Sequence, residues 1–123
     1  MATLMRSYTI ESSELIIRDE DARVAPIVAD FGGVPVYKIL PLLNGKRCLV
    51  LLDPGYSKAP TFENLLCIDS SGCVVWKAKL PKSHDAFVDV LIAGAIIEAR
   101  TWNGVRVEVD PATGTSRELG FSK

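Results

Sequence analysis

One short hairpin pattern occurs twice in the C-terminal half of the chain, and this repeat limits the fold more than any other feature. The first copy spans residues 64–76 and the second spans residues 105–117. Each copy is a short strand that ends in Asp, a turn that contains Gly, and another strand. Asp69 and Asp110 lie 41 positions apart. A period near forty, with four short strands in each unit, is typical of blade-like β-meanders.

Strand signals continue outside the two hairpins and divide residues 34–121 into two groups of four. The strands are expected at residues 34–40, 47–53, 64–68 and 73–80, and then at 86–92, 95–101, 105–109 and 115–121. Neither group leaves room for a crossover helix, so adjacent strands should be antiparallel. The sequence therefore predicts an all-β, mainly antiparallel fold with two four-stranded meanders that resemble propeller blades.

A chain of 123 residues fits a single domain. We divide it into an N-terminal segment at 1–33, a first meander at 34–81 and a second meander at 82–123. The N-terminal segment is ambiguous. Residues 9–18 fit either a strand pair or a short helix, because the stretch 11–14 resembles a helix start. Residues 23–29 fit a further strand, and residues 30–35 must form a turn or loop.

The turn at residues 102–104 predicts the register of the last sheet. A three-residue loop with a left-handed Gly at its end places residues 97, 99 and 101 opposite 109, 107 and 105, and these six form one apolar face. On the other face, Glu98 lies diagonal to Arg106 and Arg100 lies diagonal to Glu108. One apolar and one charged face are typical of a sheet at the end of a stack or in one half of a sandwich.

The first hairpin resembles the repeat of β-propellers of the pyrroloquinoline-quinone (PQQ) type, in which a strand ends in Asp, a turn ends in Gly and a Trp packs between blades. The residues that carry this resemblance are Leu66, Cys67, Ile68, Asp69, Gly72 and Trp76. The second copy has Arg117 at the position of the Trp. The resemblance implies the sheet architecture. It implies neither the quinone nor the calcium of that family's enzymes, because two blades do not close a ring.

The chain has three cysteines and no Cys-x-x-Cys spacing, which is a poor framework for disulfides or zinc. If Ile68 pairs with Cys73 across the turn, the sulfur atoms of Cys67 and Cys73 point to opposite faces of the sheet, and a register shifted by one residue would reverse this. We expect Cys48, Cys67 and Cys73 to be reduced thiols that act as small core residues.

Charge and hydropathy exclude several classes of partner. The net charge of −1 gives no global field that would attract nucleic acid or an anionic membrane. No apolar run reaches the roughly 18 residues that a membrane span needs. The first residues lack a basic patch followed by an apolar stretch, so we expect a cytoplasmic protein.

His84 stands beside Asp85 in a connection between strands, and such a pair could act as a general base with its orienting carboxylate. Adjacent residues rarely point the same way, however, so we favour a solvated loop. Asp53, Asp69 and Asp110 each follow an apolar strand and could gather calcium, but we favour a role in stabilising turns. We assign no catalytic residue, no metal ligand and no cofactor.

Three aromatic residues are the candidates for binding. Trp102 lies at a hairpin tip, where it either packs within the chain or contacts a partner. Tyr56 and Phe62 belong to the long loop 53–62. Long ordered loops on rigid sheets commonly carry binding residues, so a functional site is most expected here. Trp76, in contrast, fits packing between sheets.

Three functions compete. We rank first a non-catalytic module that binds itself or another protein through an apolar sheet face or edge. The alternative is a domain that binds a small molecule, with a pocket between sheets or under loop 53–62. A hydrolase-like enzyme that uses His84 ranks last, because no catalytic constellation accompanies this residue.

Overall fold

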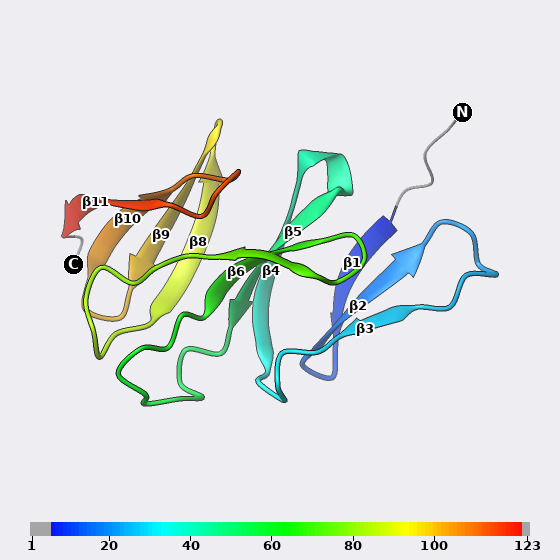
Figure 1. Cartoon of the computed structure of the whole chain (residues 1–123), viewed down its shortest axis with the longest axis horizontal. Helices are drawn as coiled ribbons and strands as arrows, with labels where there is room; N and C mark the ends of the chain where they lie inside the picture. The colour runs from blue at the N-terminus through cyan, green and yellow to red at the C-terminus, as the bar shows by residue number, and fades with distance from the viewer. Residues whose placement is uncertain (1–5, 122–123) are drawn as a thin grey trace.

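The structure is a computed structural model that describes residues 6–121, apart from the side chains of Asn44 and Phe121. It is all-β, with three antiparallel sheets that stack along the long axis of the molecule (Figure 1). The N-terminal sheet contains β1 (Arg6–Glu11), β2 (Glu14–Asp19) and β3 (Ile27–Ala29). Within the described residues the chain forms no α-helix; a 3-10 turn, η1 (Leu43–Gly45), joins β4 to β5.

The two four-stranded meanders predicted from the sequence are present. The middle sheet contains β4 (Val36–Leu42), β5 (Arg47–Leu52), β6 (Leu65–Asp69) and β7 (Val74–Lys77). The C-terminal sheet contains β8 (Phe87–Ala93), β9 (Ile96–Thr101), β10 (Val105–Val109) and β11 (Ser116–Phe121). In both sheets the strands follow chain order and every pair of neighbours is antiparallel.

The strand β7 is shorter than predicted, because the expected strand continued to residue 80 and β7 ends at Lys77. The backbone N–H of Ala78 still donates to the carbonyl of Leu65, over 2.9 Å. Leu65 is the first residue of β6, so no backbone partner from that strand remains beyond this point.

The ambiguous residues 9–18 form a strand pair and not a helix. Ser12 and Ser13 join β1 to β2 with φ values of 52° and 66°, the positive angles at both central positions that a tight hairpin turn requires. Leu15 and Ile17 of β2 are buried, whereas Glu14 and Arg18 are exposed. This alternation with a period of two is typical of a strand with one buried face.

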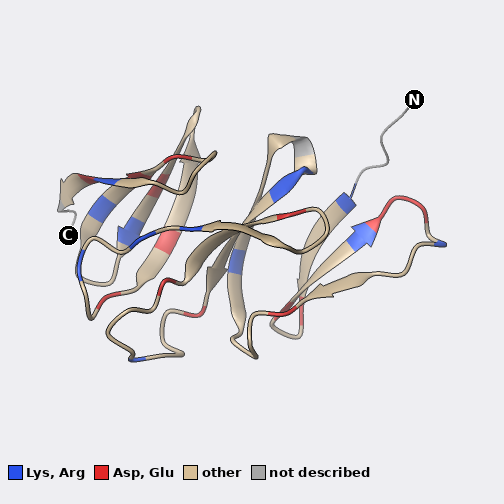
Figure 2. Ribbon diagram, viewed as in Figure 1, with Lys and Arg blue, Asp and Glu red and all other residues tan. Residues whose placement is uncertain are grey.

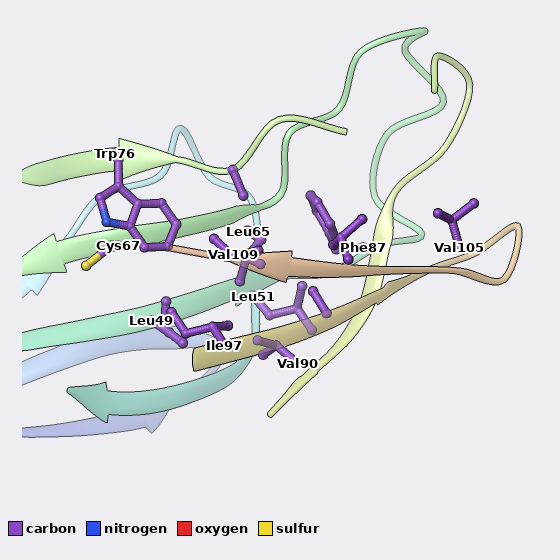
Figure 3. Close-up of a cluster of buried hydrophobic side chains, with 13 residues drawn as sticks. Leu49, Leu51, Leu65, Cys67, Trp76, Phe87, Val90, Ile97, Val105 and Val109 are labelled. Carbon is purple, nitrogen blue, oxygen red and sulfur yellow. The ribbon is translucent and has the colours of Figure 1, made fainter. Parts of the chain in front are cut away.

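The two central strands of the middle sheet, β5 and β6, are buried on both faces. Leu49, Leu51 and Leu65 pack in the core that this sheet shares with the C-terminal sheet (Figure 3). Cys48 and Val50 pack in the core that it shares with the N-terminal sheet. Strands covered on both sides need apolar residues at every position. The uninterrupted apolar run of β5 follows from this position in the stack.

The C-terminal sheet has the predicted register. Ala99 lies opposite Val107 and Ile97 lies opposite Val109, and Gly104 ends the turn with a φ of +87°. The face that carries these four apolar residues is covered by the middle sheet, so the C-terminal sheet is the end of a stack.

Acidic and basic residues are interspersed along the strands of the C-terminal sheet (Figure 2). The guanidinium of Arg106 approaches the carboxylate of Glu98 to 2.6 Å, as the diagonal placement predicted. Arg100 is also diagonal to Glu108, as predicted, but the ion pair of Glu108 forms with a different strand. Glu108 binds Arg117 of β11, because Arg117 is directly opposite Glu108 whereas Arg100 is only diagonal to it.

Trp76 packs between the two meanders. Its side chain is buried, and the indole N–H donates to the carbonyl oxygen of Pro111 in the β10–β11 turn, over 3.0 Å. A Cβ atom placed on Gly114 would lie 2.6 Å from two atoms of the indole ring. The turn of the C-terminal sheet therefore rests directly on this ring, and the inter-sheet role predicted for Trp76 is confirmed.

All three cysteines are free thiols, as predicted. Ile68 lies opposite Val74 and not Cys73, and a bulge then places Cys67 opposite Trp76. Cys67 is buried, but Cys73 is exposed, so the prediction that all three cysteines lie in the core is wrong for Cys73. Burial raises the pKa of the Cys48 thiol to about 12 and also raises the pKa of Cys67.

Candidate functional site

A cleft of about 430 Å³ lies where three connections meet at one end of the two meanders. The β5–β6 loop contributes Pro54 and Lys58, the β7–β8 connection contributes His84 and Asp85, and the β9–β10 turn contributes Trp102. These residues come from positions almost fifty apart in the chain. The cleft combines an aromatic wall with a carboxylate, an ammonium group and an imidazole.

The β5–β6 loop is held in place by backbone groups. The Oδ1 atom of Asp53 accepts a hydrogen bond from the N–H of Gly55 over 2.9 Å, which closes the first turn of the loop. At the far end, the N–H of His84 donates to the carbonyl of Pro60 over 2.7 Å, and Thr61 forms a parallel bridge with Asp85. The wall of the cleft is therefore tied to the connection that carries Asp85.

Asn64 fixes the two meanders to each other beside the cleft. It is fully buried, and its Nδ2 donates to the carbonyl of Leu52 over 2.9 Å and to the carbonyl of Phe87 over 2.8 Å. Its Oδ1 accepts from the N–H of Phe87 over 2.8 Å. The Asn64 amide thus pairs with both backbone groups of Phe87, as the backbone of a neighbouring strand would. This positions the start of β8, two residues after Asp85.

Asp85 is a buried carboxylate with only 6% of its surface exposed. Its Oδ1 accepts hydrogen bonds from the backbone N–H of Ala86 over 2.9 Å and from that of Asn103 over 3.2 Å. Its Oδ2 has no hydrogen-bond partner, and among the described residues it is the one buried side-chain polar atom of this kind. Buried polar atoms are nearly always paired, so this oxygen distinguishes the cleft from the rest of the fold.

Trp102 stands on the rim of the cleft with 77% of its surface exposed. Its position is defined by its backbone, because its N–H donates to the carbonyl of Ala86 over 2.8 Å. The next residue, Asn103, donates to Asp85. One turn therefore presents the indole and also orients the carboxylate.

The other two predicted binding residues do not line the cleft. Tyr56 belongs to the same loop, but its side chain is outside the cleft and about half exposed. Phe62 is half-buried at the end of the loop and also lies outside the cleft. Trp102 lines the same cleft as loop 53–62, as expected for a binding residue. The loop residues that line the cleft include Pro54 and Lys58, but not the aromatic residues Tyr56 and Phe62.

His84 and Asp85 do not form the paired arrangement that general-base catalysis needs. The imidazole of His84 belongs to an exposed residue with a positive φ of 57°. The Oδ1 of Asp85 accepts hydrogen bonds from backbone N–H groups and its Oδ2 has no hydrogen-bond partner, so Asp85 does not orient the imidazole. Both residues line the cleft, but as separate groups.

The three aspartates at strand ends each stabilise their own turn. The Oδ1 atoms of Asp53, Asp69 and Asp110 accept hydrogen bonds from backbone N–H groups two residues further on. Hydrogen bonding, first of all from the Ser71 hydroxyl, lowers the pKa of Asp69. The described residues contain no cluster of three His, Cys, Asp or Glu side chains suited to a metal ion. They also contain no helix with the length and apolar character that a membrane crossing requires.

Asn64 and Asp85 were not recognised from the sequence as buried residues of this site. The available signal was weak: Asn64 is a polar residue at the start of an expected apolar strand, and Asp85 directly precedes another expected strand. In both cases the burial comes from contacts between distant segments, which local patterns do not reveal.

Comparison with known proteins relates most of the chain to one family. A family model described as Domain of unknown function (DUF7957) matches residues 36–121, from the first residue of β4 to the last residue of β11. The matched range contains both meanders and all three connections of the cleft. A search of curated proteins found no match.

Proposed function

The chain belongs to the family described as Domain of unknown function (DUF7957), and we propose that it is a non-catalytic module that binds a small organic ligand in the cleft under loop 53–62. The volume of about 430 Å³ lies within the range of about 300–1,000 Å³ that is usual for small-molecule sites. Such sites combine apolar walls with a few polar groups. Here Pro54 and Trp102 supply apolar surface, and Asp85 supplies the polar group.

The unpaired Oδ2 of Asp85 is the observation that carries this proposal. Leaving a buried polar atom without a partner costs about 1–3 kcal/mol. The surrounding chain preserves this arrangement through two hydrogen bonds to Oδ1 and through Asn64, which holds Phe87 two residues after Asp85. A ligand that donates to Oδ2 recovers this cost on binding.

A ligand-observed NMR screen tests the proposal, followed by mapping of amide shifts in the labelled protein. We expect hits from a mixed fragment library to shift the resonances of Asp85, Asn103 and the Trp102 indole. Trp102→Ala should weaken these hits at least about tenfold, which is about 1.4 kcal/mol. Tyr37→Ala is the matched control, because Tyr37 is an aromatic residue with 60% exposure that lies outside the cleft.

Equal losses in the two variants would show that the fragments bind exposed aromatic rings in general. Shifts confined to residues outside the three connections would also refute the proposal.

A second candidate function is self-association, and one exposed segment favours it. The β8–β9 hairpin tip runs Leu91-Ile92-Ala93-Gly94-Ala95-Ile96, without a polar side chain. Leu91 and Ile92 are 47% and 43% exposed. The apolar face of the C-terminal sheet is already covered, and this tip offers a run of exposed apolar side chains to a second copy. Light scattering tests this: Leu91→Ser should lower the mass measured at high concentration, and a monomeric mass for the unaltered chain would exclude it.

The cytoplasmic location stays part of the proposal. Three unpaired thiols, one of them exposed, support a reducing compartment. Fractionation of cells that produce the protein would test this location.

A further inference from the structure

We propose, on the basis of the ligand site in the cleft, that the ligand is a primary ammonium compound whose charged group binds Asp85 and whose apolar body lies against Trp102. This inference rests on the proposed function and adds the chemical class of the ligand.

The carboxylate of Asp85 is prepared for a donor. A carboxylate only accepts hydrogen bonds, so Oδ2 requires an N–H or O–H group from a partner. The two N–H donors on Oδ1 hold the carboxylate in one orientation and leave Oδ2 as the remaining acceptor. Charged N–H donors form hydrogen bonds with carboxylates that are about twice as strong as those between neutral groups. Because Asp85 is buried, this difference is larger than it would be in water.

The indole of Trp102 favours the same class of ligand. Cations are attracted to the face of an indole ring, by about 0.5–1 kcal/mol at exposed sites and by about 2 kcal/mol after desolvation. The ring is 77% exposed, and its backbone is held by the hydrogen bond to Ala86. The turn that carries it also donates to Asp85 through Asn103. An ammonium group with a short apolar body matches both features together.

The basic side chains of the cleft do not outweigh Asp85. Lys58 and His84 line the same cleft, and both are exposed. Repulsion from exposed charges is screened by solvent and salt, whereas the attraction of a buried carboxylate is screened less. Since Oδ2 is buried in the free protein, binding requires a small movement of the atoms that cover it.

Four probes that share one aromatic body test the class: 2-phenylethylamine, 2-phenylethanol, 3-phenylpropanoate and trimethyl(2-phenylethyl)ammonium. Each is titrated into the labelled protein, and the amide of Asn103 and the indole N–H of Trp102 are followed by NMR. We expect the primary amine to bind at least about tenfold more tightly than the alcohol and than the quaternary ion, which lacks an N–H donor. The probe 3-phenylpropanoate, which carries a carboxylate itself, should not bind.

Asp85→Asn should reduce the affinity of the amine at least about tenfold and leave that of the alcohol nearly unchanged. Asp110→Asn is the control, because Asp110 is an exposed turn aspartate that does not line the cleft. If Asp85→Asn fails to fold, the comparison of the four probes on the unaltered protein still decides the question.

The possible results separate the two proposals. If the alcohol or the carboxylate binds as tightly as the amine and depends on Trp102, the ammonium class is wrong and the ligand cleft stands. If the amine does not shift the cleft resonances but other fragments do, the proposal of an ammonium ligand is also overturned. If neither the probes nor the fragment library shift them, the proposed function is overturned as well.

Discussion

Replacing Gly114 by Ala tests how closely the β10–β11 turn rests on Trp76. Gly114 has a φ of +78°, an angle that costs residues with a Cβ about 1–2 kcal/mol. The added Cβ would also lie 2.6 Å from two atoms of the indole and 2.9 Å from a third, so the ring or the turn must move. Overpacking of this kind costs about 1–3 kcal/mol. We therefore expect the substitution to lower the free energy of unfolding by about 2–5 kcal/mol.

Gly94→Ala is the matched control for the backbone contribution. Gly94 has a φ of +62°, and nothing lies within 4 Å of the Cβ position. This variant should lose only the backbone part, about 1–2 kcal/mol. For a domain of this size, 1 kcal/mol corresponds to about 4 °C in the melting temperature. Gly114→Ala should therefore melt about 8–20 °C lower and Gly94→Ala about 4–8 °C lower than the unaltered chain.

Urea unfolding, followed by circular dichroism and by tryptophan fluorescence, measures both variants. Trp76→Leu in the Gly114→Ala background should reduce the difference between Ala and Gly at residue 114, because the clash is with the indole. If Gly114→Ala and Gly94→Ala lose the same free energy to within about 0.5 kcal/mol, the turn does not rest on the ring as described.

Three further outcomes follow from the structure. Asn64→Ala removes three buried hydrogen bonds and should lower the free energy of unfolding by at least about 3 kcal/mol in urea titrations, so a loss below about 1 kcal/mol would contradict the role described. In the native protein a thiol reagent should modify Cys73 quickly and should reach the buried Cys48 and Cys67 only in denaturant; three equally fast reactions would contradict their burial. Burial raises the pKa of Tyr8 from 10.0 to about 12, so the unfolded chain releases this proton first and the free energy of unfolding should fall as the pH rises from 10 to 12. Tyr8→Phe should remove that part of the pH dependence in unfolding measurements, and an unchanged dependence would exclude Tyr8 as its source.

The meanders were predictable because their signals are local. In the C-terminal sheet, apolar residues at every second position and the left-handed Gly104 leave a single register that buries one face. The same reasoning was less decisive for the first hairpin, where the bulge beside Cys67 shifts the partner of Ile68. A bulge adds one unpaired residue, and apolar residues on both faces of the middle sheet tolerate either register.

The cleft was predictable only in part. Loop 53–62 was identified by its length, and Trp102 by its position at a hairpin tip. Asp85 was considered only as a partner of His84, because its burial depends on the β9–β10 turn, eighteen residues further along the chain. Asn64 carried only the weak signal of a polar residue beside an apolar strand. Contacts between remote segments determine which polar residues become buried, and such contacts are absent from local patterns.

The position of the middle sheet has a consequence for any shortened version of the protein. A fragment that begins at residue 36, where the family match starts, would retain both meanders but would lose β1, β2 and β3. Val50, Leu66 and Ile68, which are at most 2% exposed in the whole chain, would then face water. Such a fragment should self-associate through this uncovered surface. Aggregation of the fragment would therefore reveal nothing about how the intact protein assembles.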